Sequence, residues 1–128
     1  MHIFKEFHFD AAHQLGANVA AGHKYGRVHG HSFRAQLRFS GEPAPETGWI
    51  CDFADIDMAI ADIQAALDHQ YLNEIPGLEQ PTLERLCIWI WARVEKTLPA
   101  LSQVTVWRGT QKEGCIYTGP GQQPVDID

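Results

Sequence analysis

Histidines with a close and regular spacing are the first chemical feature of this sequence. His29 and His31 are two residues apart, and His13 precedes them at the end of the first alternating segment. In an extended chain, residues two apart point the same way at a separation of about 6.5 Å, so both imidazoles can meet one ion. A catalytic zinc takes three protein ligands and leaves a fourth position for water or substrate. We therefore predict a metal site on His13, His29 and His31, with zinc ahead of iron or nickel because imidazole donors suit it.

Three other histidines leave alternatives open. His8 has the opposite parity along its strand, His2 lies near the terminus, and His23 is close enough in sequence to compete as a ligand. Each histidine, taken alone, also fits an ordinary surface or turn position. The metal prediction therefore depends on the pattern of three.

A second candidate for chemistry is the neighbouring pair Asp68 and His69. A carboxylate beside an imidazole can orient it and favour its charged form, as a general acid or base near neutral pH requires. The alternative is a solvated helix end, where a histidine meets the negative end of the helix dipole. Both interpretations remain open from the sequence.

Alternating apolar and polar residues predict the strands that position these side chains. Residues 2–9 alternate with Lys5 as an exception, and residues 31–40 alternate strictly. Residues 104–107 and 115–117 are predicted to close the domain as a hairpin around a loop that contains Gly109.

Two segments between these strands have the spacing of amphipathic helices. The first begins after Asp52, which suits the N-cap, and ends near Asp68. The second begins after Thr82 and continues to Pro99, which stops it.

The order strand, strand, helix, helix, strand, strand predicts an α+β fold with an antiparallel four-stranded sheet and two helices on one face. We expect residues 1–118 to form a single domain and residues 119–128 a C-terminal arm. An open four-stranded sheet leaves two edges to cover, so we expect a homo-oligomer that associates through them.

Composition excludes several classes of protein. The 128 residues carry a formal charge of −6, which argues against nucleic-acid binding through phosphate neutralisation. No apolar run reaches the roughly 20 residues of a membrane span, and no signal peptide is evident, so we expect a cytoplasmic protein without a membrane partner. Cys51, Cys87 and Cys115 form no CxxC pair, which indicates neither disulfides nor a thiolate metal site. We expect them to be inert packing residues.

Four segments of the chain resemble the 6-pyruvoyl-tetrahydropterin synthase and 6-carboxytetrahydropterin synthase family. They are FDAAH at residues 9–13, GHKYGRVHGH at 22–31, GWICDF at 48–53 and LDHQYLN at 67–73. The likeness is closest to the bacterial branch that makes 6-carboxytetrahydropterin on the route to queuosine. It implies the tunnelling fold, in which ββααββ subunits form trimeric barrels that stack into a hexamer.

The resemblance also implies site roles. Zinc on the three histidines would grip the side-chain hydroxyls of 7,8-dihydroneopterin triphosphate. Asp68 and His69 would be the proton-relay pair, reaching the site from a neighbouring subunit. The bacterial reaction expels triphosphate and acetaldehyde and leaves the carboxylated tetrahydropterin. Lys24, Arg27 and Arg108 would bind substrate, because a locally positive field can hold a polyphosphate on an acidic protein.

Two positions depart from the family pattern. Tyr25 stands where the family keeps its catalytic cysteine, and a phenol, with a reference pKa near 10 against about 8.5 for a thiol, is the poorer base. Arg108 or Gly109 stands where the family carries a glutamate that holds the pterin, and arginine offers donors only. We expect Glu113 to be a solvated loop residue rather than a substitute.

These observations predict a zinc-dependent lyase of the 6-carboxytetrahydropterin synthase type, with Tyr25, Asp68 and His69 as its catalytic residues. Two alternatives stay open. One is a related enzyme that acts on a different pterin or a purine-like substrate. The other is a catalytically impaired, zinc-stabilised protein that binds such a ligand.

Overall fold

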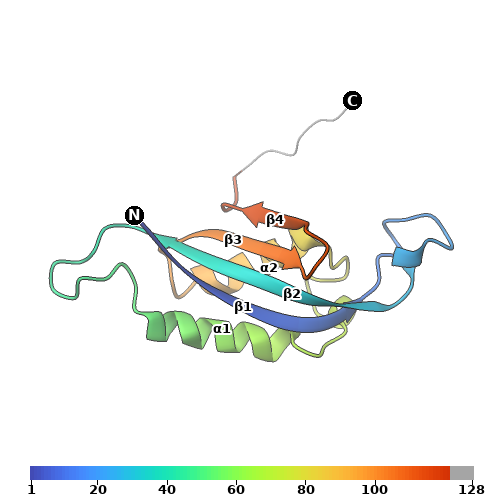
Figure 1. Ribbon diagram of the computed structural model, residues 1–128, viewed down its shortest axis with the longest axis horizontal. Coiled ribbons are helices and arrows are strands. Elements are labelled where there is room, and N and C mark those ends of the chain that lie inside the picture. Colours follow the sequence, from blue (N-terminus) through green and yellow to red (C-terminus); the bar gives the residue numbers. More distant parts are fainter. Residues whose placement is uncertain (122–128) are drawn as a thin grey trace.

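The computed structural model describes residues 1–121, which form two layers, an antiparallel sheet of four strands and two helices over one of its faces (Figure 1). The strands follow one another across the sheet in the order β1-β2-β3-β4, so each pairs with its neighbour in sequence. The predicted order of elements is confirmed. The bounds are β1 His2–His13, β2 His29–Ser40, α1 Phe53–Leu67, α2 Leu83–Glu95, β3 Leu101–Arg108 and β4 Gly114–Tyr117, with 3-10 turns at Lys24–Gly26 and Leu72–Glu74.

The first two strands are longer than the alternation predicts. β1 continues past residue 9 to His13, and β2 begins at His29 instead of residue 31. The two strands pair in register along their whole length, from His2 with Ser40 to His13 with His29. Hydrogen bonds to a neighbouring strand keep residues of low strand propensity in an extended conformation. Propensity alone therefore underestimates the length of the strand. The consequence is that the three candidate metal ligands lie on strands.

One face of the sheet forms the core with the helices. Odd-numbered residues of β1 and β2 point toward α1 and α2, as do Leu101, Val104 and Val106 of β3. Phe9 and Phe33 stack across the strand pair with ring centroids 5.1 Å apart, and both are fully buried. Burying a side chain of this size stabilises the fold by about 1.5–3 kcal/mol. Lys5, the exception in the alternation, forms an ion pair with Asp57 of α1.

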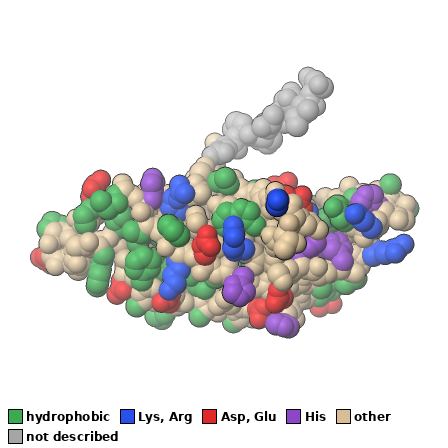
Figure 2. All heavy atoms as spheres, viewed as in Figure 1, with side chains coloured by type: hydrophobic (Ala, Val, Ile, Leu, Met, Phe, Trp, Pro, Cys, Tyr) green, Lys and Arg blue, Asp and Glu red, His purple; other side chains and the backbone are tan. Residues whose placement is uncertain are grey.

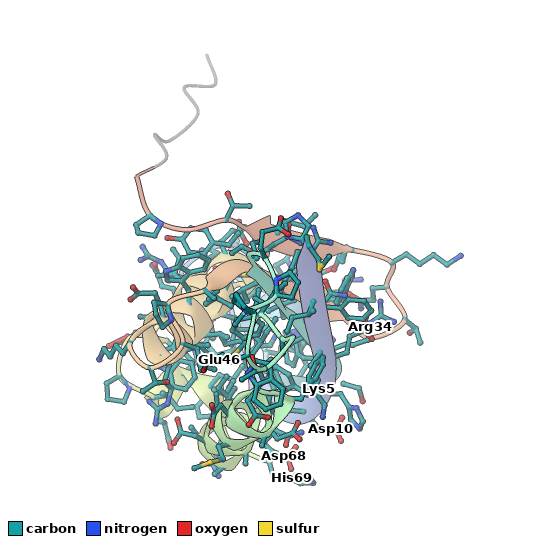
Figure 3. The ribbon with its side chains drawn as sticks, turned by 90° about the vertical axis from the view of Figure 1, so that its left-hand side faces the viewer. Lys5, Asp10, Arg34, Glu46, Asp68 and His69 are labelled. Carbon is teal, nitrogen blue, oxygen red and sulfur yellow. The ribbon has the colours of Figure 1, made fainter. Side chains whose placement is uncertain are left out.

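The opposite face of the sheet is not covered by the helices and carries polar residues. Arg34 projects from β2 over the ring of Trp107, with its guanidinium carbon 4.2 Å from the ring centre. Figure 3 shows Arg34 on this side of the molecule, away from the helices. The alternation of β1 and β2 therefore separates a buried face from a polar face.

Both predicted helix starts are confirmed by capping hydrogen bonds. A carboxylate oxygen of Asp52 accepts from the Ala54 N–H at 2.9 Å, and the Thr82 hydroxyl accepts from the Arg85 N–H at 3.2 Å. α2 ends at Glu95, one turn before Pro99, and is therefore shorter than predicted.

The cysteines are not poised for chemistry. Cys87 is fully buried, and its thiol donates to the Val104 carbonyl. Burial is the main cause that raises the pKa of each thiol above its usual value. Thiols of this kind are protonated near neutral pH and are poor nucleophiles.

No helix within residues 1–121 is long and apolar enough to cross a membrane. Most of the predicted C-terminal arm, residues 122–128, lies outside the described part of the chain.

Candidate metal centre and active site

His13, His29 and His31 come together at the end of the β1–β2 ladder and are called the histidine triad below. His13 lies opposite His29 in the strand register, and His31 lies two residues further along β2 on the same face. Their ring centroids are 4.6 to 5.0 Å apart. One ring nitrogen from each residue lies within 4.8 Å of the others, so the triad could hold one metal ion. Figure 2 shows histidine side chains gathered toward this end of the molecule.

Backbone carbonyls set the proton position on two of these imidazoles. Nδ1 of His13 lies 2.9 Å from the Pro81 carbonyl oxygen, and Nδ1 of His29 lies 2.8 Å from that of Arg27. Because a carbonyl only accepts, we assign the proton of each ring to Nδ1, which leaves a lone pair on Nε2. Nε2 of His13 is buried and has no hydrogen-bond partner within residues 1–121. Metal-binding histidines use this arrangement, so the residues present fit a metal ion.

Two of the three imidazoles, those of His13 and His31, have pKa values below the usual value for histidine. Burial lowers the pKa of His13 to about 4. The hydrogen bond that His13 donates to the Pro81 carbonyl acts in the opposite direction, and the neighbouring imidazoles lower the pKa further. Burial also lowers the pKa of His31, and the charges of His29 and Arg108 add to the effect. Neutral imidazole is the form that coordinates metal, so these lowered pKa values reduce the competition of protons with a metal ion at His13 and His31.

The loop between β1 and β2 places Tyr25 beside the triad. Its half-buried ring stacks on His29 at 5.8 Å between centroids, and its carbonyl accepts from the Leu15 N–H at 2.7 Å. The Lys24 ammonium lies 5.4 Å from the centre of the Tyr25 ring. Lys24 and Arg27 are both exposed, so this loop offers two cations next to the phenol and the triad.

Arg108 at the end of β3 lies opposite Phe33 and close enough to the triad for its charge to lower the pKa of His13 and His31. Its Nη1 donates to a carboxylate oxygen of Glu113 at 3.1 Å. Glu113 is an exposed loop residue, as expected, and its carboxylate is in addition paired with Arg108. The β3–β4 hairpin turns the chain back, and the Arg108 N–H donates to the Glu113 carbonyl at 3.2 Å, which a spacing count along the sequence does not reveal.

Asp68 and His69 form a hydrogen-bonded pair along the outer edge of β1 (Figure 3). One Asp68 oxygen accepts from the Asp10 N–H and the other from Nδ1 of His69, both at 2.9 Å. His69 has a left-handed backbone at φ 58°, and its own N–H donates to the Asp10 carbonyl. These hydrogen bonds lower the pKa of Asp68, and the Asp68 carboxylate raises the pKa of His69. The pair is exposed, but its hydrogen bonds to the backbone of Asp10 hold it against β1. A solvated helix end without partners, the alternative interpretation of the sequence, would lack these hydrogen bonds.

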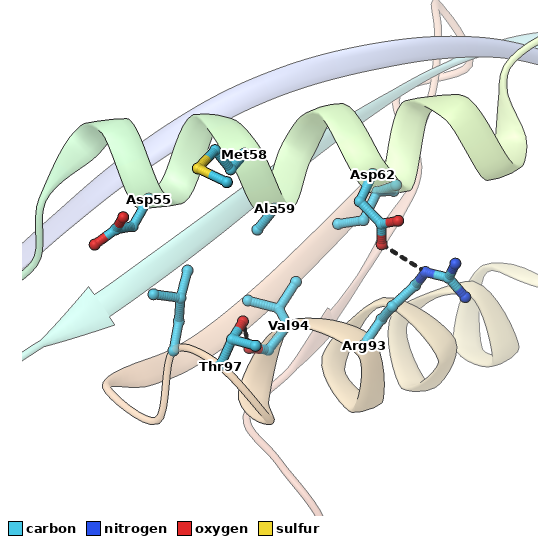
Figure 4. Close-up of a pocket in the computed structure, with 9 residues that line it drawn as sticks. Asp55, Met58, Ala59, Asp62, Arg93, Val94 and Thr97 are labelled. Carbon is cyan, nitrogen blue, oxygen red and sulfur yellow. Dashed lines mark hydrogen bonds and ion pairs between the residues drawn. The ribbon is translucent and has the colours of Figure 1, made fainter.

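The pair and the triad occupy different parts of one chain. The triad lies on the face that packs against the helices, whereas Asp68 and His69 follow the β1 edge. An open groove of about 630 Å³ is lined by residues of both regions, among them His31 and His69. A second cavity, of about 480 Å³, lies between α1 and α2 beside the Asp62–Arg93 ion pair (Figure 4). None of the candidate site residues lines that second cavity.

Comparison with known proteins agrees with this architecture. The pattern of the 6-pyruvoyl tetrahydropterin synthase family matches residues 2–120. A 6-carboxy-5,6,7,8-tetrahydropterin synthase from Synechocystis is 39% identical over 96% of this chain and 97% of its own. A dihydroneopterin monophosphate aldolase from Pyrococcus furiosus is 30% identical over 80% of this chain and 85% of its own.

Structural comparison gives the same fold. The 6-pyruvoyl tetrahydropterin synthase of Caenorhabditis elegans superposes with a TM-score of 0.83 at 21% identity, covering 93% of this chain and 95% of the other. The tunnelling fold expected from the resemblance is confirmed at the level of the subunit. With the family pattern spanning nearly all of the described residues, the chain belongs to the 6-pyruvoyl tetrahydropterin synthase family.

Proposed function

We propose that this protein is a zinc-dependent lyase of the 6-carboxy-5,6,7,8-tetrahydropterin synthase type that acts on 7,8-dihydroneopterin triphosphate. The observation that carries the proposal is the histidine triad, whose ligand atoms lie within 4.8 Å of one another in a chain 39% identical to such a synthase. The product would enter the queuosine pathway. The proposed protein is a cytoplasmic homo-oligomer built on trimeric barrels, with a hexamer as the complete form.

His13, His29 and His31 would hold the metal, since the Nε2 lone pairs of His13 and His29 are free and Nε2 of His13 is buried without a partner within residues 1–121. Zinc bound there would supply Lewis acidity that lowers the pKa of the substrate's side-chain hydroxyls. Side chains of the protein would carry out the remaining steps, which are substrate binding and proton transfer.

Each of these groups has a proposed task. Lys24 and Arg27 attract the triphosphate, because both are exposed cations on the loop beside the triad. Tyr25 exchanges a proton with the substrate side chain through its hydroxyl. His69, whose pKa is raised by Asp68, carries a proton at Nε2 to the site of a neighbouring subunit.

The test is turnover of dihydroneopterin triphosphate by the zinc-loaded protein, with acetaldehyde and the pterin products measured separately. Tyr25→Phe removes only the hydroxyl and keeps the stacking on His29, so it is the matched variant for the proposed proton transfer. We expect the wild type to release acetaldehyde and Tyr25→Phe to be slower by about 10²–10⁴-fold.

Tyr25→Cys restores the residue of the family pattern and extends the test. Turnover by Tyr25→Cys together with none by the wild type would contradict the proposed role of the phenol. No turnover by either protein, with zinc bound, would contradict the proposed reaction itself.

A further inference from the structure

Asn73 is a half-buried residue of the 3-10 turn Leu72–Glu74, and its side-chain amide clamps the residue that follows His13. Its Oδ1 accepts from the Gln14 N–H and its Nδ2 donates to the Gln14 carbonyl, both at 3.0 Å. These partners fix the orientation of the amide, because an N–H needs an oxygen opposite it and a carbonyl needs a donor. One side chain therefore satisfies both backbone groups of the residue next to a candidate metal ligand.

The same amide also reaches the segment that leads into α2. Nδ2 of Asn73 donates to the Glu79 carbonyl at 3.4 Å. Two residues later, the buried Pro81 supplies the carbonyl oxygen that lies 2.9 Å from Nδ1 of His13. Asn73 thus joins the residue after His13 to the segment that carries the hydrogen-bond acceptor of His13.

Turns and buried leucines shape the chain between these contacts. The Ile75 N–H donates to the Leu72 carbonyl at 3.0 Å, and the Leu78 N–H donates to the Ile75 carbonyl at 2.9 Å. Leu72 and Leu78 are fully buried in the core. Loss of the Asn73 hydrogen bonds would therefore shift the segment against β1 without removing its anchors in the core.

The His13 ring depends on the position of the Pro81 carbonyl. Rotation about the bond between Cβ and the ring has broad, roughly two-fold minima in histidine, so a half-turn exchanges the sides on which Nδ1 and Nε2 lie. The hydrogen bond from Nδ1 to Pro81 selects the orientation that leaves Nε2 without a protein partner within residues 1–121. A separation of about 3.6 Å is too long for a hydrogen bond, so a shift of the carbonyl by less than about 1 Å would release the ring.

We infer that Asn73 is a positioning residue of the metal centre, whose amide holds the Pro81 carbonyl against His13 and so sets the affinity of the histidine triad for its metal ion. The inference rests on the metal dependence of the proposed function and adds the residue that fixes the orientation of one ligand. Asn73 acts through the backbone of Gln14 and of residues 79–81, not by coordination.

Asn73→Asp is the decisive variant, because it keeps the size of the side chain and the oxygen that accepts from Gln14. It replaces Nδ2 by a second oxygen, so an acceptor would face the carbonyls of Gln14 and Glu79. Cobalt(II) is titrated into the metal-free full chain, since cobalt(II) has visible absorption that zinc, with its filled d shell, lacks. We expect the affinity for cobalt(II) to fall by about tenfold, the lower end of the range for groups that support a metal-binding histidine.

Two further variants control this measurement. Gln80→Glu makes the same change from amide to carboxylate on an exposed side chain next to Pro81, and it should keep the wild-type affinity. Asn73→Ala removes the three side-chain hydrogen bonds without adding a charge, and it should also lose about tenfold in affinity. Melting curves of the metal-free proteins show which variants fold.

The proton position on His13 gives a readout that a purely structural role of Asn73 would not change. In the metal-free wild type, nitrogen NMR of the imidazole should show the Nδ1–H form of His13 alone, because the Pro81 carbonyl only accepts. In Asn73→Asp we expect the Nε2–H form to appear beside it.

The outcomes separate this inference from the proposed function. A folded Asn73→Asp that binds cobalt(II) within about threefold of the wild type, or that retains the Nδ1–H form alone, would overturn the inference even if the wild type turns over dihydroneopterin triphosphate. Failure of both Asn73 variants to fold would also overturn it, because the side chain would then be needed for the fold and not for the position of one carbonyl. Reduced affinity and a mixed His13 ring form, without turnover of that substrate by the wild type, support the inference and contradict the proposed reaction. A wild type that binds no cobalt(II) contradicts both.

Discussion

Zinc should raise the melting temperature of the wild-type protein and have little effect on His29→Ala. His29 is the ligand to remove because its side chain is only partly buried, whereas truncation of the fully buried His13 would also open a cavity in the core. His8→Ala is the matched control. It removes an exposed imidazole from the other face of β1 and leaves the triad intact.

The size of the effect follows from binding linkage. Free zinc at 100 times its dissociation constant stabilises the folded state by about 2.7 kcal/mol. For a chain of this length 1 kcal/mol corresponds to roughly 4 °C in melting temperature, so the wild type should melt roughly 11 °C higher with zinc. Removing a group that hydrogen-bonds to a metal-binding histidine weakens metal affinity by about 10- to 100-fold. Removing the histidine itself should therefore lower the affinity for zinc by at least about 100-fold. At the same free zinc, His29→Ala then gains only about 0.4 kcal/mol, or roughly 2 °C.

The assay is thermal unfolding followed by circular dichroism at neutral pH, with free zinc set by a chelator buffer and bound zinc measured by mass spectrometry. His8→Ala should show the full wild-type shift. The proposed ligand set would be refuted if His29→Ala retained one equivalent of zinc and the wild-type shift. Equal losses in His29→Ala and His8→Ala would also refute it, because the effect would then not depend on the triad.

Three further predictions test the hydrogen bonds and backbone that position the site. Asp68→Asn should lower the pKa of His69 toward its usual value, as followed by NMR of the ring. Because the folded-state pKa of His69 is raised, the stabilisation from the wild-type pair is present at low pH and lost as the pH rises through that pKa, and this loss should disappear in the variant. Thr82→Ala removes the cap of α2 and should cost about 1 kcal/mol in denaturant unfolding. Gly109→Ala should cost more than about 1 kcal/mol in the same measurement, since its backbone has φ +45° and the added carbon would meet the Ser32 carbonyl; an unchanged midpoint would show that the hairpin loop is not constrained.

Much of the fold follows from local patterns that a single sequence contains. Strict alternation in β2 separates the buried face from the polar face, and Asp52 and Thr82 begin their helices because each side chain accepts a nearby backbone N–H. Strand ends were less predictable. The last residues of β1 carry a weak pattern of their own and are extended because β2 pairs with them.

The part of the metal site that follows from the alternation of side chains along a strand was predictable from the sequence. Residues two apart on a strand share a face, so His29 and His31 had to point the same way once the strand was assigned. The distance between His13 and His29 was not predictable in this way. It depends on the register of β1 against β2, which pairs these two residues directly.

The sequence by itself therefore determined the order of the elements, the helix starts, the side of the strands on which the histidines lie and the unusual Tyr25 and Arg108. Only the tertiary structure decided which groups act on one another across the chain. Pro81 fixes the proton of His13, β1 orders the Asp68–His69 pair, and the hairpin brings Glu113 to Arg108. These contacts join residues through backbone hydrogen bonds and chain reversals, and such bonds depend on where the chain folds back rather than on the residue types it contains.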